Sequence, residues 1–115
     1  MNKIISVEKE FMDIPLWIKN PDGVFLPMDR KMDGILNKMH PSTMKKLIEY
    51  SKKWENIQKD IIKTNHKSVL ISKLNKEVLM LEDFSRDIAL ELKEQFPINY
   101  KFCYWSESKM ERIFV

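Results

Sequence analysis

Apolar and polar residues alternate at the start of the chain. Over residues 3–11 the apolar positions are Ile5, Val7 and Phe11, and the polar positions between them are Ser6, Glu8 and Glu10. This period of two predicts a half-buried strand. A second apolar segment, residues 14–18, is followed by Asn20-Pro21-Asp22-Gly23 and then by residues 24–26. Proline and glycine at these turn positions predict a β-hairpin.

The spacing of apolar residues then changes to the period of a helix. Asp29 is expected to cap a short helix that ends at His40-Pro41, with Met32, Ile35, Leu36 and Met39 on its apolar face. Ser42 or Thr43 is expected to cap a longer helix that runs to about residue 65. Its apolar side is formed by Met44, Leu47, Ile48, Trp54, Ile57, Ile61 and Ile62.

A third helix is predicted over residues 69–96, after a turn at residues 64–68. Its apolar stripe has heptad-type spacing and is formed by Ile71, Leu74, Val78, Leu81, Ser85, Ile88 and Leu92. The stripe is long enough to form a homo-oligomer, but the second helix could also cover it within one chain.

Strand-like alternation returns after Pro97, with Tyr100, Phe102 and Tyr104 on one face, and residues 110–115 form another short strand. The element order β-β-β-α-α-α-β-β predicts the α+β class. We expect a small antiparallel sheet, built from the N-terminal strands and the C-terminal hairpin, packed against one short and two long helices. With 115 residues the chain is expected to form a single domain, 1–115.

The composition favours a reducing, cytoplasmic location. Cys103 is the only cysteine, so no intramolecular disulfide can form, and the charged residues among the first twenty interrupt any export signal. The longest strictly apolar run, residues 78–81, is far shorter than a membrane-spanning helix. The excess of lysine over arginine and the single alanine are typical of translation from an AT-rich genome.

Charge is segregated along the chain. Residues 30–76 hold twelve bases and four acids, whereas residues 77–97 hold two bases and six acids. Lys45, Lys52, Lys59 and Lys63 recur at steps of seven and four, which places them in one row that could follow phosphates. The more common explanation is a solvated helix face, since interspersed acids such as Glu49 neutralise the row.

No arrangement of residues marks a catalytic or metal site. Cys103 lies in an apolar strand, and neither His40 nor His66 has a sequence-local carboxylate at a telling spacing. One cysteine and two dispersed histidines do not supply the four ligands of structural zinc, and Gly23 and Gly34 cannot form a glycine-rich phosphate loop. We therefore expect neither an enzyme nor a cofactor.

The aromatic C-terminal hairpin could stack nucleobases, although its aromatic face more often meets the helices of the core. Trp17 and Trp105 lie at hairpin positions and are candidate anchors for a partner. The candidate binding residues are accordingly Lys45, Lys52, Lys59, Lys63, Trp17, Trp105, Lys101 and Arg112.

These observations favour a non-catalytic interaction protein that occupies the surface of a protein or nucleoprotein complex. In size, composition and lack of catalytic signatures the chain resembles small phage or mobile-element accessory proteins, among them inhibitors of nucleic-acid-handling defence complexes, although no alignable motif carries this resemblance. Two alternatives stay open. One is direct binding of RNA or single-stranded DNA through the lysine row and the aromatic hairpin. The other is an oligomer that sequesters a small anionic ligand between protomers.

Overall fold

The computed structural model describes residues 2–9, 14–28, 34–63 and 68–115, with backbone alone for 61–63 and 68–74. Its elements have the predicted order β-β-β-α-α-α-β-β, which confirms the α+β class. They are β1 (Lys3–Val7), β2 (Leu16–Lys19), β3 (Phe25–Pro27), α1 (Ile35–Lys38), α2 (Pro41–Lys63), α3 (Ser68–Gln95), β4 (Tyr100–Ser106) and β5 (Glu111–Phe114). Predictions for Glu10, Phe11, Asp29, Met32 and the turn at 64–67 lie outside the described residues.

The strands form one sheet in the order β3-β2-β1-β4-β5. The neighbours are antiparallel except for β1 and β4, which run parallel with Ile5 opposite Phe102. The expected purely antiparallel sheet was therefore wrong for the pair β1 and β4. Parallel neighbours need a long crossover connection, which the helical layer provides here, and alternation of residues within a strand is the same for either direction.

The predicted hairpin joins β2 to β3 and is confirmed in its details. Gly23 has a φ of +87°, a conformation that a residue with a Cβ rarely adopts. Its N–H donates to the carbonyl of Asn20 at 3.0 Å, and the Asn20 side chain accepts a hydrogen bond from the N–H of Val24 at 2.9 Å. Local turn chemistry is sufficient to define this connection.

The second helix begins at Pro41, so the expected cap at Ser42 or Thr43 was wrong. Proline suits the first turn of a helix because its missing N–H would have no partner there. Thr43 is instead fully buried, where its hydroxyl accepts a hydrogen bond from Gln95 at 2.6 Å and lies 3.4 Å from a carboxylate oxygen of Glu91. These contacts join the start of α2 to the end of α3.

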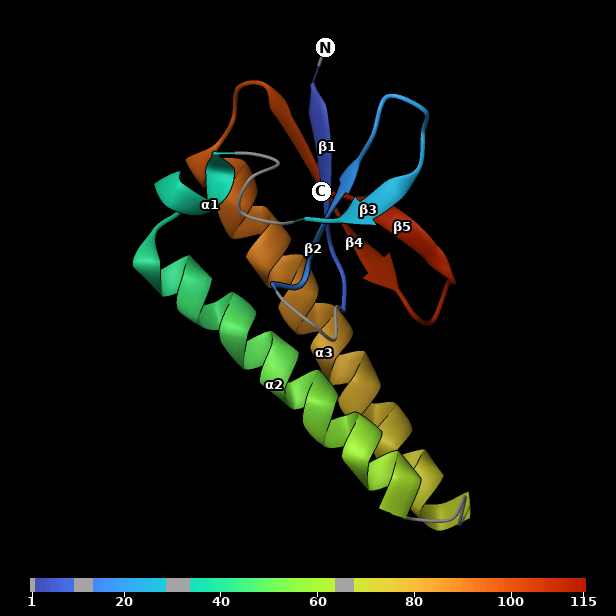
Figure 1. Ribbon diagram of the computed structural model, residues 1–115. Helices are drawn as coiled ribbons and strands as arrows, with labels where there is room; N and C mark the ends of the chain where they lie inside the picture. The colour runs from blue at the N-terminus through green and yellow to red at the C-terminus, as the bar shows by residue number, and fades with distance from the viewer. Residues whose placement is uncertain (1, 10–13, 29–33, 64–67) are drawn as a thin grey trace.

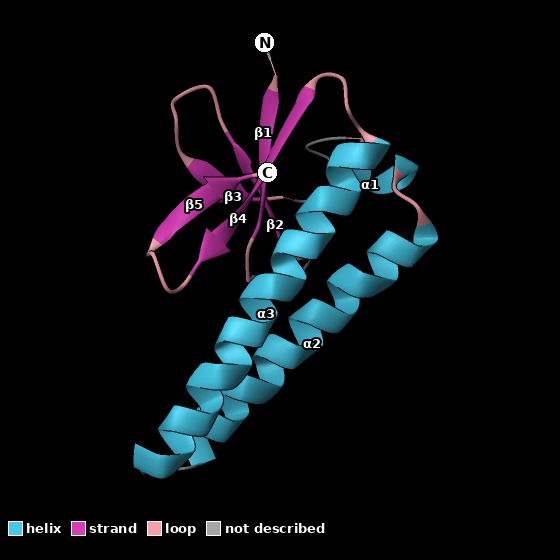
Figure 2. Cartoon of the chain, turned by 180° about the vertical axis from the view of Figure 1, so that it is seen from behind, coloured by secondary structure: helices cyan, strands magenta, loops and turns pink. Residues whose placement is uncertain are grey.

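The hydrophobic core lies between α3 and one face of the sheet. Ile88 and Leu92 of α3 are fully buried, as are Ile5 and Val7 of β1, and Phe102 of β4 is 2 % exposed. In Figures 1 and 2, α2 runs antiparallel alongside α3, and the pair extends beyond the sheet. No helix among the described residues is long and apolar enough to cross a membrane.

The burial of side chains bears on three of the sequence-based interpretations. The described part of the predicted oligomerisation stripe is filled within this chain, because Leu81, Ile88 and Leu92 belong to its own core. Phe102 and Tyr104 are also buried, so the aromatic face of β4 is core rather than a platform for nucleobases. The apolar side assigned to α2 was wrong at Ile48, which is 47 % exposed.

The sheet is strongly curled, which the sequence did not indicate. Although β3 and β5 are its opposite edges, the guanidinium carbon of Arg112 on β5 lies 3.8 Å from the ring centroid of Phe25 on β3. The edge strands lie close together in both Figures 1 and 2. The curl encloses the face opposite α3, so Ser6 and Cys103 on that face are fully buried. The polar side of β1 therefore faces the enclosed interior of the curled sheet rather than solvent.

Candidate functional site

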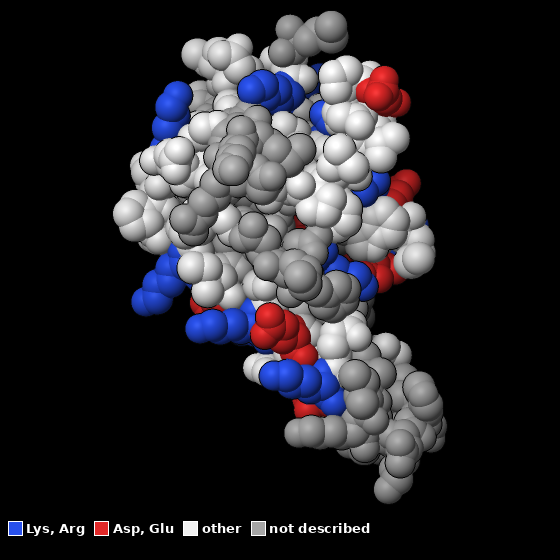
Figure 3. All heavy atoms as spheres, in the orientation of Figure 1, with Lys and Arg blue, Asp and Glu red and all other residues white. Residues whose placement is uncertain are grey.

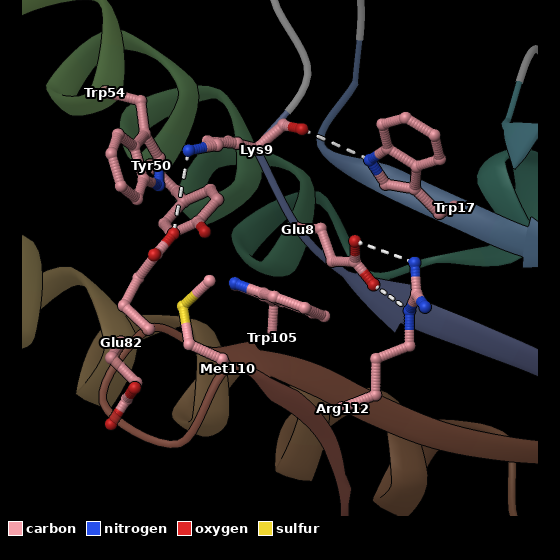
Figure 4. Close-up of a pocket in the computed structure, with 10 residues that line it drawn as sticks. Glu8, Lys9, Trp17, Tyr50, Trp54, Glu82, Trp105, Met110 and Arg112 are labelled. Carbon is pink, nitrogen blue, oxygen red and sulfur yellow. Dashed lines mark hydrogen bonds and ion pairs between the residues drawn. The ribbon is translucent and has the colours of Figure 1, made fainter. Parts of the chain in front are cut away.

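The inner face of the curled sheet leads into a cavity of about 350 Å³, bordered by the helices. This volume lies at the lower end of the range of small-ligand sites. Three strands (β2, β4 and β5), two helices (α2 and α3) and the adjoining connections contribute residues to the wall. Figure 4 shows how their side chains lie around the cavity. The lining residues are Glu8, Lys9, Trp17, Tyr50, Trp54, Glu82, Trp105, Glu107, Met110 and Arg112.

A bidentate ion pair forms one wall of the cavity. The Nε and Nη2 atoms of Arg112 donate to the two carboxylate oxygens of Glu8, the second at 3.2 Å. The side chain of Glu8 is only 11 % exposed and that of Arg112 is 31 % exposed. The guanidinium also packs on Phe25 and lies 5.5 Å from the ring centroid of Trp105. Arg112 thus joins the last strand both to the end of β1 and to the opposite edge of the sheet.

Lys9 packs against the face of Trp54 at another part of the cavity wall. Its ammonium nitrogen lies 4.7 Å from the ring centroid of Trp54 and 3.6 Å from a carboxylate oxygen of Glu107. The indole N–H of Trp17 donates to the Lys9 carbonyl at 3.2 Å, which fixes the backbone beside this lysine. The Lys9 side chain is 41 % exposed, so its ion pair is accessible to water.

Tyr50 and Trp54 form the aromatic wall on α2. Their rings meet edge to face with centroids 6.4 Å apart, and both residues are buried. Burial raises the pKa of the Tyr50 hydroxyl far above its ordinary value, despite the opposing effect of the neighbouring Trp54 N–H, so the hydroxyl stays neutral at physiological pH. The Trp54 N–H is shielded from water, and no acceptor among the described residues lies at the distance and angle of a hydrogen bond to it.

Glu82 of α3 fixes the turn between β4 and β5 beside the cavity. Its carboxylate accepts hydrogen bonds from the N–H of Ser108 at 3.3 Å and from the Ser108 hydroxyl at 3.4 Å. Burial raises the pKa of Glu82, but hydrogen bonds from Ser106, Ser108 and Glu107 together outweigh burial and lower that pKa below its ordinary value. Glu82 is therefore ionised at neutral pH and holds the turn in place.

The charged groups of the cavity are almost all paired, with carboxylates in excess. Three carboxylates line it, from Glu8, Glu82 and Glu107, against the two cations of Lys9 and Arg112. Both cations are paired with a carboxylate of the wall. The cavity therefore favours a neutral or cationic group, and an anion would meet carboxylates without an unpaired cation of the lining to offset them.

The structure brings together three of the eight predicted binding residues. Trp17, Trp105 and Arg112 all line the cavity, although the sequence placed Trp17 on one hairpin and Trp105 and Arg112 on the other. Lys101 is exposed on β4 and does not line the cavity. The lysine row lies elsewhere, and the side chain of Lys63 is outside the described set.

The described lysines of the row lie on the side of α2 opposite its buried residues. Lys45, Lys52 and Lys59 are exposed, and none forms an ion pair within the described part of the chain. Of the expected acid–lysine pairs, the one between Glu49 and Lys53 is confirmed at 3.6 Å, but Lys53 lies outside the row. No ion pair joins Glu55 to Lys59 among the described residues, so the row itself is not neutralised by direct pairing. In Figure 3 positive and negative side chains lie side by side over α2.

Seven lining residues were not identified as binding residues from the sequence. Glu8 was one of the polar positions within the predicted strand, and Trp54 was assigned to the core, where it does pack. The signal that could have found them is the set of three tryptophans, one each from β2, α2 and β4, in a chain of this size. Their convergence depends on the curl of the sheet and cannot be derived from local patterns.

Comparison with protein-family models, curated proteins and solved structures gives no match for this chain. Within the described residues, no three or more histidine, cysteine, aspartate or glutamate side chains are grouped so that they could hold a metal ion. Burial raises the pKa of the Cys103 thiol, the only cysteine, and so keeps it protonated.

Proposed function

We propose that this chain is a non-catalytic interaction protein that binds a partner protein through the tryptophan-lined cavity. The observation that carries the proposal is the convergence of Trp17, Trp54 and Trp105 around one cavity whose wall includes Arg112. Tryptophan and arginine dominate the energetic centres of protein interfaces. Trp17 and Trp105 are both partly exposed, so a partner could reach them.

The charge of the cavity favours a protein over the two alternatives. Its three carboxylates would repel the phosphates of a nucleic acid, and its arginine is already paired with Glu8. A small anion would meet the same obstacle. Inhibition of a nucleic-acid-handling complex remains compatible with this proposal, provided that contact is made with a protein component.

The test is affinity capture from the native cell extract, followed by measurement of the dissociation constant with the purified partner. Trp17→Leu and Trp105→Leu should each weaken binding at least tenfold, because loss of an interface centre typically costs about 2 kcal/mol. Circular dichroism must show that both variants fold. The matched control is the triple variant with Lys45, Lys52 and Lys59 changed to Glu, which should bind normally. Normal binding by both tryptophan variants would refute the proposal.

A second candidate function, binding of single-stranded nucleic acid, is favoured by the exposed lysine row alone. Three phosphate contacts predict a slope of about −2 in a plot of log affinity against log salt concentration. The triple glutamate variant should abolish this binding while Trp105→Leu leaves it intact. A partner resistant to nuclease, with no such salt dependence, would exclude this candidate.

A further inference from the structure

The position of Lys9 indicates which chemical group the cavity receives. Its ammonium is held between the face of Trp54, 4.7 Å away, and the carboxylate of Glu107, 3.6 Å away. An aromatic face combined with a carboxylate is the arrangement that stabilises a protonated amine or guanidinium. The cavity thus already holds a cation supplied by its own chain.

Arg112 is a second cation in the cavity wall, and it too lies between aromatic rings and a carboxylate. The Arg112 guanidinium packs on Phe25, faces Trp105 and is paired with Glu8. These two sites differ in strength. The arginine forms two hydrogen bonds to a carboxylate that is nearly buried, whereas Lys9 makes one long contact to a carboxylate that is 25 % exposed. Exposed pairs of the second kind contribute little to stability, so Lys9 is the cation that can be displaced.

Resting on the proposed function, we propose that the cavity binds a lysine or arginine side chain of the partner, and that Lys9 occupies this position in the free protein. The incoming cation would replace the Lys9 ammonium between Trp54 and Glu107. The carboxylate of Glu82, ionised beside the cavity, adds to the attraction. Lys9 acts as an internal competitor that lowers the apparent affinity for the partner.

The test uses blocked single amino acids and the full chain. Nα-acetyl-lysine methylamide and its arginine counterpart are titrated against the protein while the indole N–H signals of its three tryptophans are followed by NMR. The acetyl-norleucine amide, which has nearly the shape of lysine without its charge, is the control ligand. We expect signal shifts with both cationic probes and none with norleucine.

Variants of two lysines make the test specific. Lys9→Met keeps the aliphatic stem and removes the competing charge, so it should bind the lysine probe about two- to fivefold more tightly, as expected for an exposed cation–π contact. Lys53→Met is the matched control, because Lys53 also combines a ring contact, 5.2 Å from Phe84, with a carboxylate contact to Glu49 outside the cavity. It should leave the affinity unchanged.

Several outcomes would overturn the inference. One is an unchanged affinity of the Lys9→Met variant for the lysine probe, and another is binding of the norleucine probe as tight as that of lysine. Adenosine, titrated in the same way as a neutral planar ligand, should bind more weakly than the cationic probes; tighter binding would show a site for neutral planar groups. The two proposals fail separately. If the tryptophan variants lose the partner but no cationic probe shifts the indole signals, the cation inference falls and the binding function stands. If the probes bind but the tryptophan variants keep the partner, the cavity does bind cations, but the proposal that the partner docks there falls.

Discussion

The ion pair between Glu8 and Arg112 should contribute unequally to stability according to which partner is removed. Arg112→Leu leaves a carboxylate whose side chain is only 11 % exposed, with no other cation at hydrogen-bond distance in the described residues. Glu8→Gln leaves a guanidinium that is 31 % exposed and keeps its contacts with Phe25 and Trp105. We therefore expect the arginine variant to be the less stable.

The expected magnitudes follow from these exposures. Removing one partner of a fully buried pair costs about 3–5 kcal/mol. The partial exposure of Arg112 moves the cost of Arg112→Leu to about 3 kcal/mol, because some water already reaches the pair. For Glu8→Gln we expect about 1–2 kcal/mol, since the guanidinium can turn toward water. The double variant that combines Glu8→Gln with Arg112→Leu should be more stable than Arg112→Leu alone, because no charge is then left unpaired.

Urea unfolding followed by tryptophan fluorescence measures these differences. Thermal unfolding gives a second reading, at roughly 4 °C in midpoint for each kcal/mol in a chain of this length. Equal losses for the two single variants would refute the argument from unequal exposure. A double variant whose loss equals the sum of the single losses would show that the two side chains are not coupled.

Three further predictions test the core, the turn and the thiol. Leu92→Ala should lower the free energy of unfolding by about 3 kcal/mol in urea titrations, whereas Ile48→Ala, at an exposed position, should change it by less than about 0.5 kcal/mol. Burial raises the pKa of Glu82, but the hydrogen bonds from the turn lower it by more, so the folded-state pKa lies below the ordinary value of 4.5. The contribution of Glu82 to the stability of the fold is therefore complete above pH 4.5 and is lost as the pH falls through the lowered pKa. Glu82→Gln should flatten this part of a stability profile measured between pH 6 and pH 3. Because burial shields Cys103 and raises its pKa, a thiol reagent should modify it only as urea unfolds the chain, and rapid reaction in the absence of urea would contradict its burial.

The parts of the fold that the sequence predicts correctly are those governed by local chemistry. The hairpin follows from Asn20 and Gly23, which meet the hydrogen-bonding and φ requirements of the turn by themselves. The third helix follows from an apolar spacing whose described members are buried as expected, such as Ile88 and Leu92, except for Val78, which is half-buried. In each case the determining residues lie within a few positions of one another.

The features that the sequence did not predict depend on contacts between distant segments. The curl of the sheet brings Arg112 to Phe25, and nothing near either residue specifies that contact. The same curl buries Ser6 and Glu8, which alternation had assigned to the polar side of a half-buried strand. Prediction of the candidate site was therefore partial: Trp17 and Trp105 were identified by residue type and hairpin position, but not the cavity between them.

Stability alone does not account for an ion pair in the cavity wall. Apolar residues of similar volume often stabilise a protein as well as a buried pair does, because charges lose hydration on burial. The double replacement of Glu8→Leu and Arg112→Leu would fill the inner face of the sheet, but it would remove this charged pair from the cavity wall. If this Glu8→Leu/Arg112→Leu variant unfolds at the urea concentration of the unmodified protein yet no longer binds the partner, the pair is retained for recognition. If it keeps the partner, the pair only fixes the curl of the sheet, and recognition depends on the tryptophans.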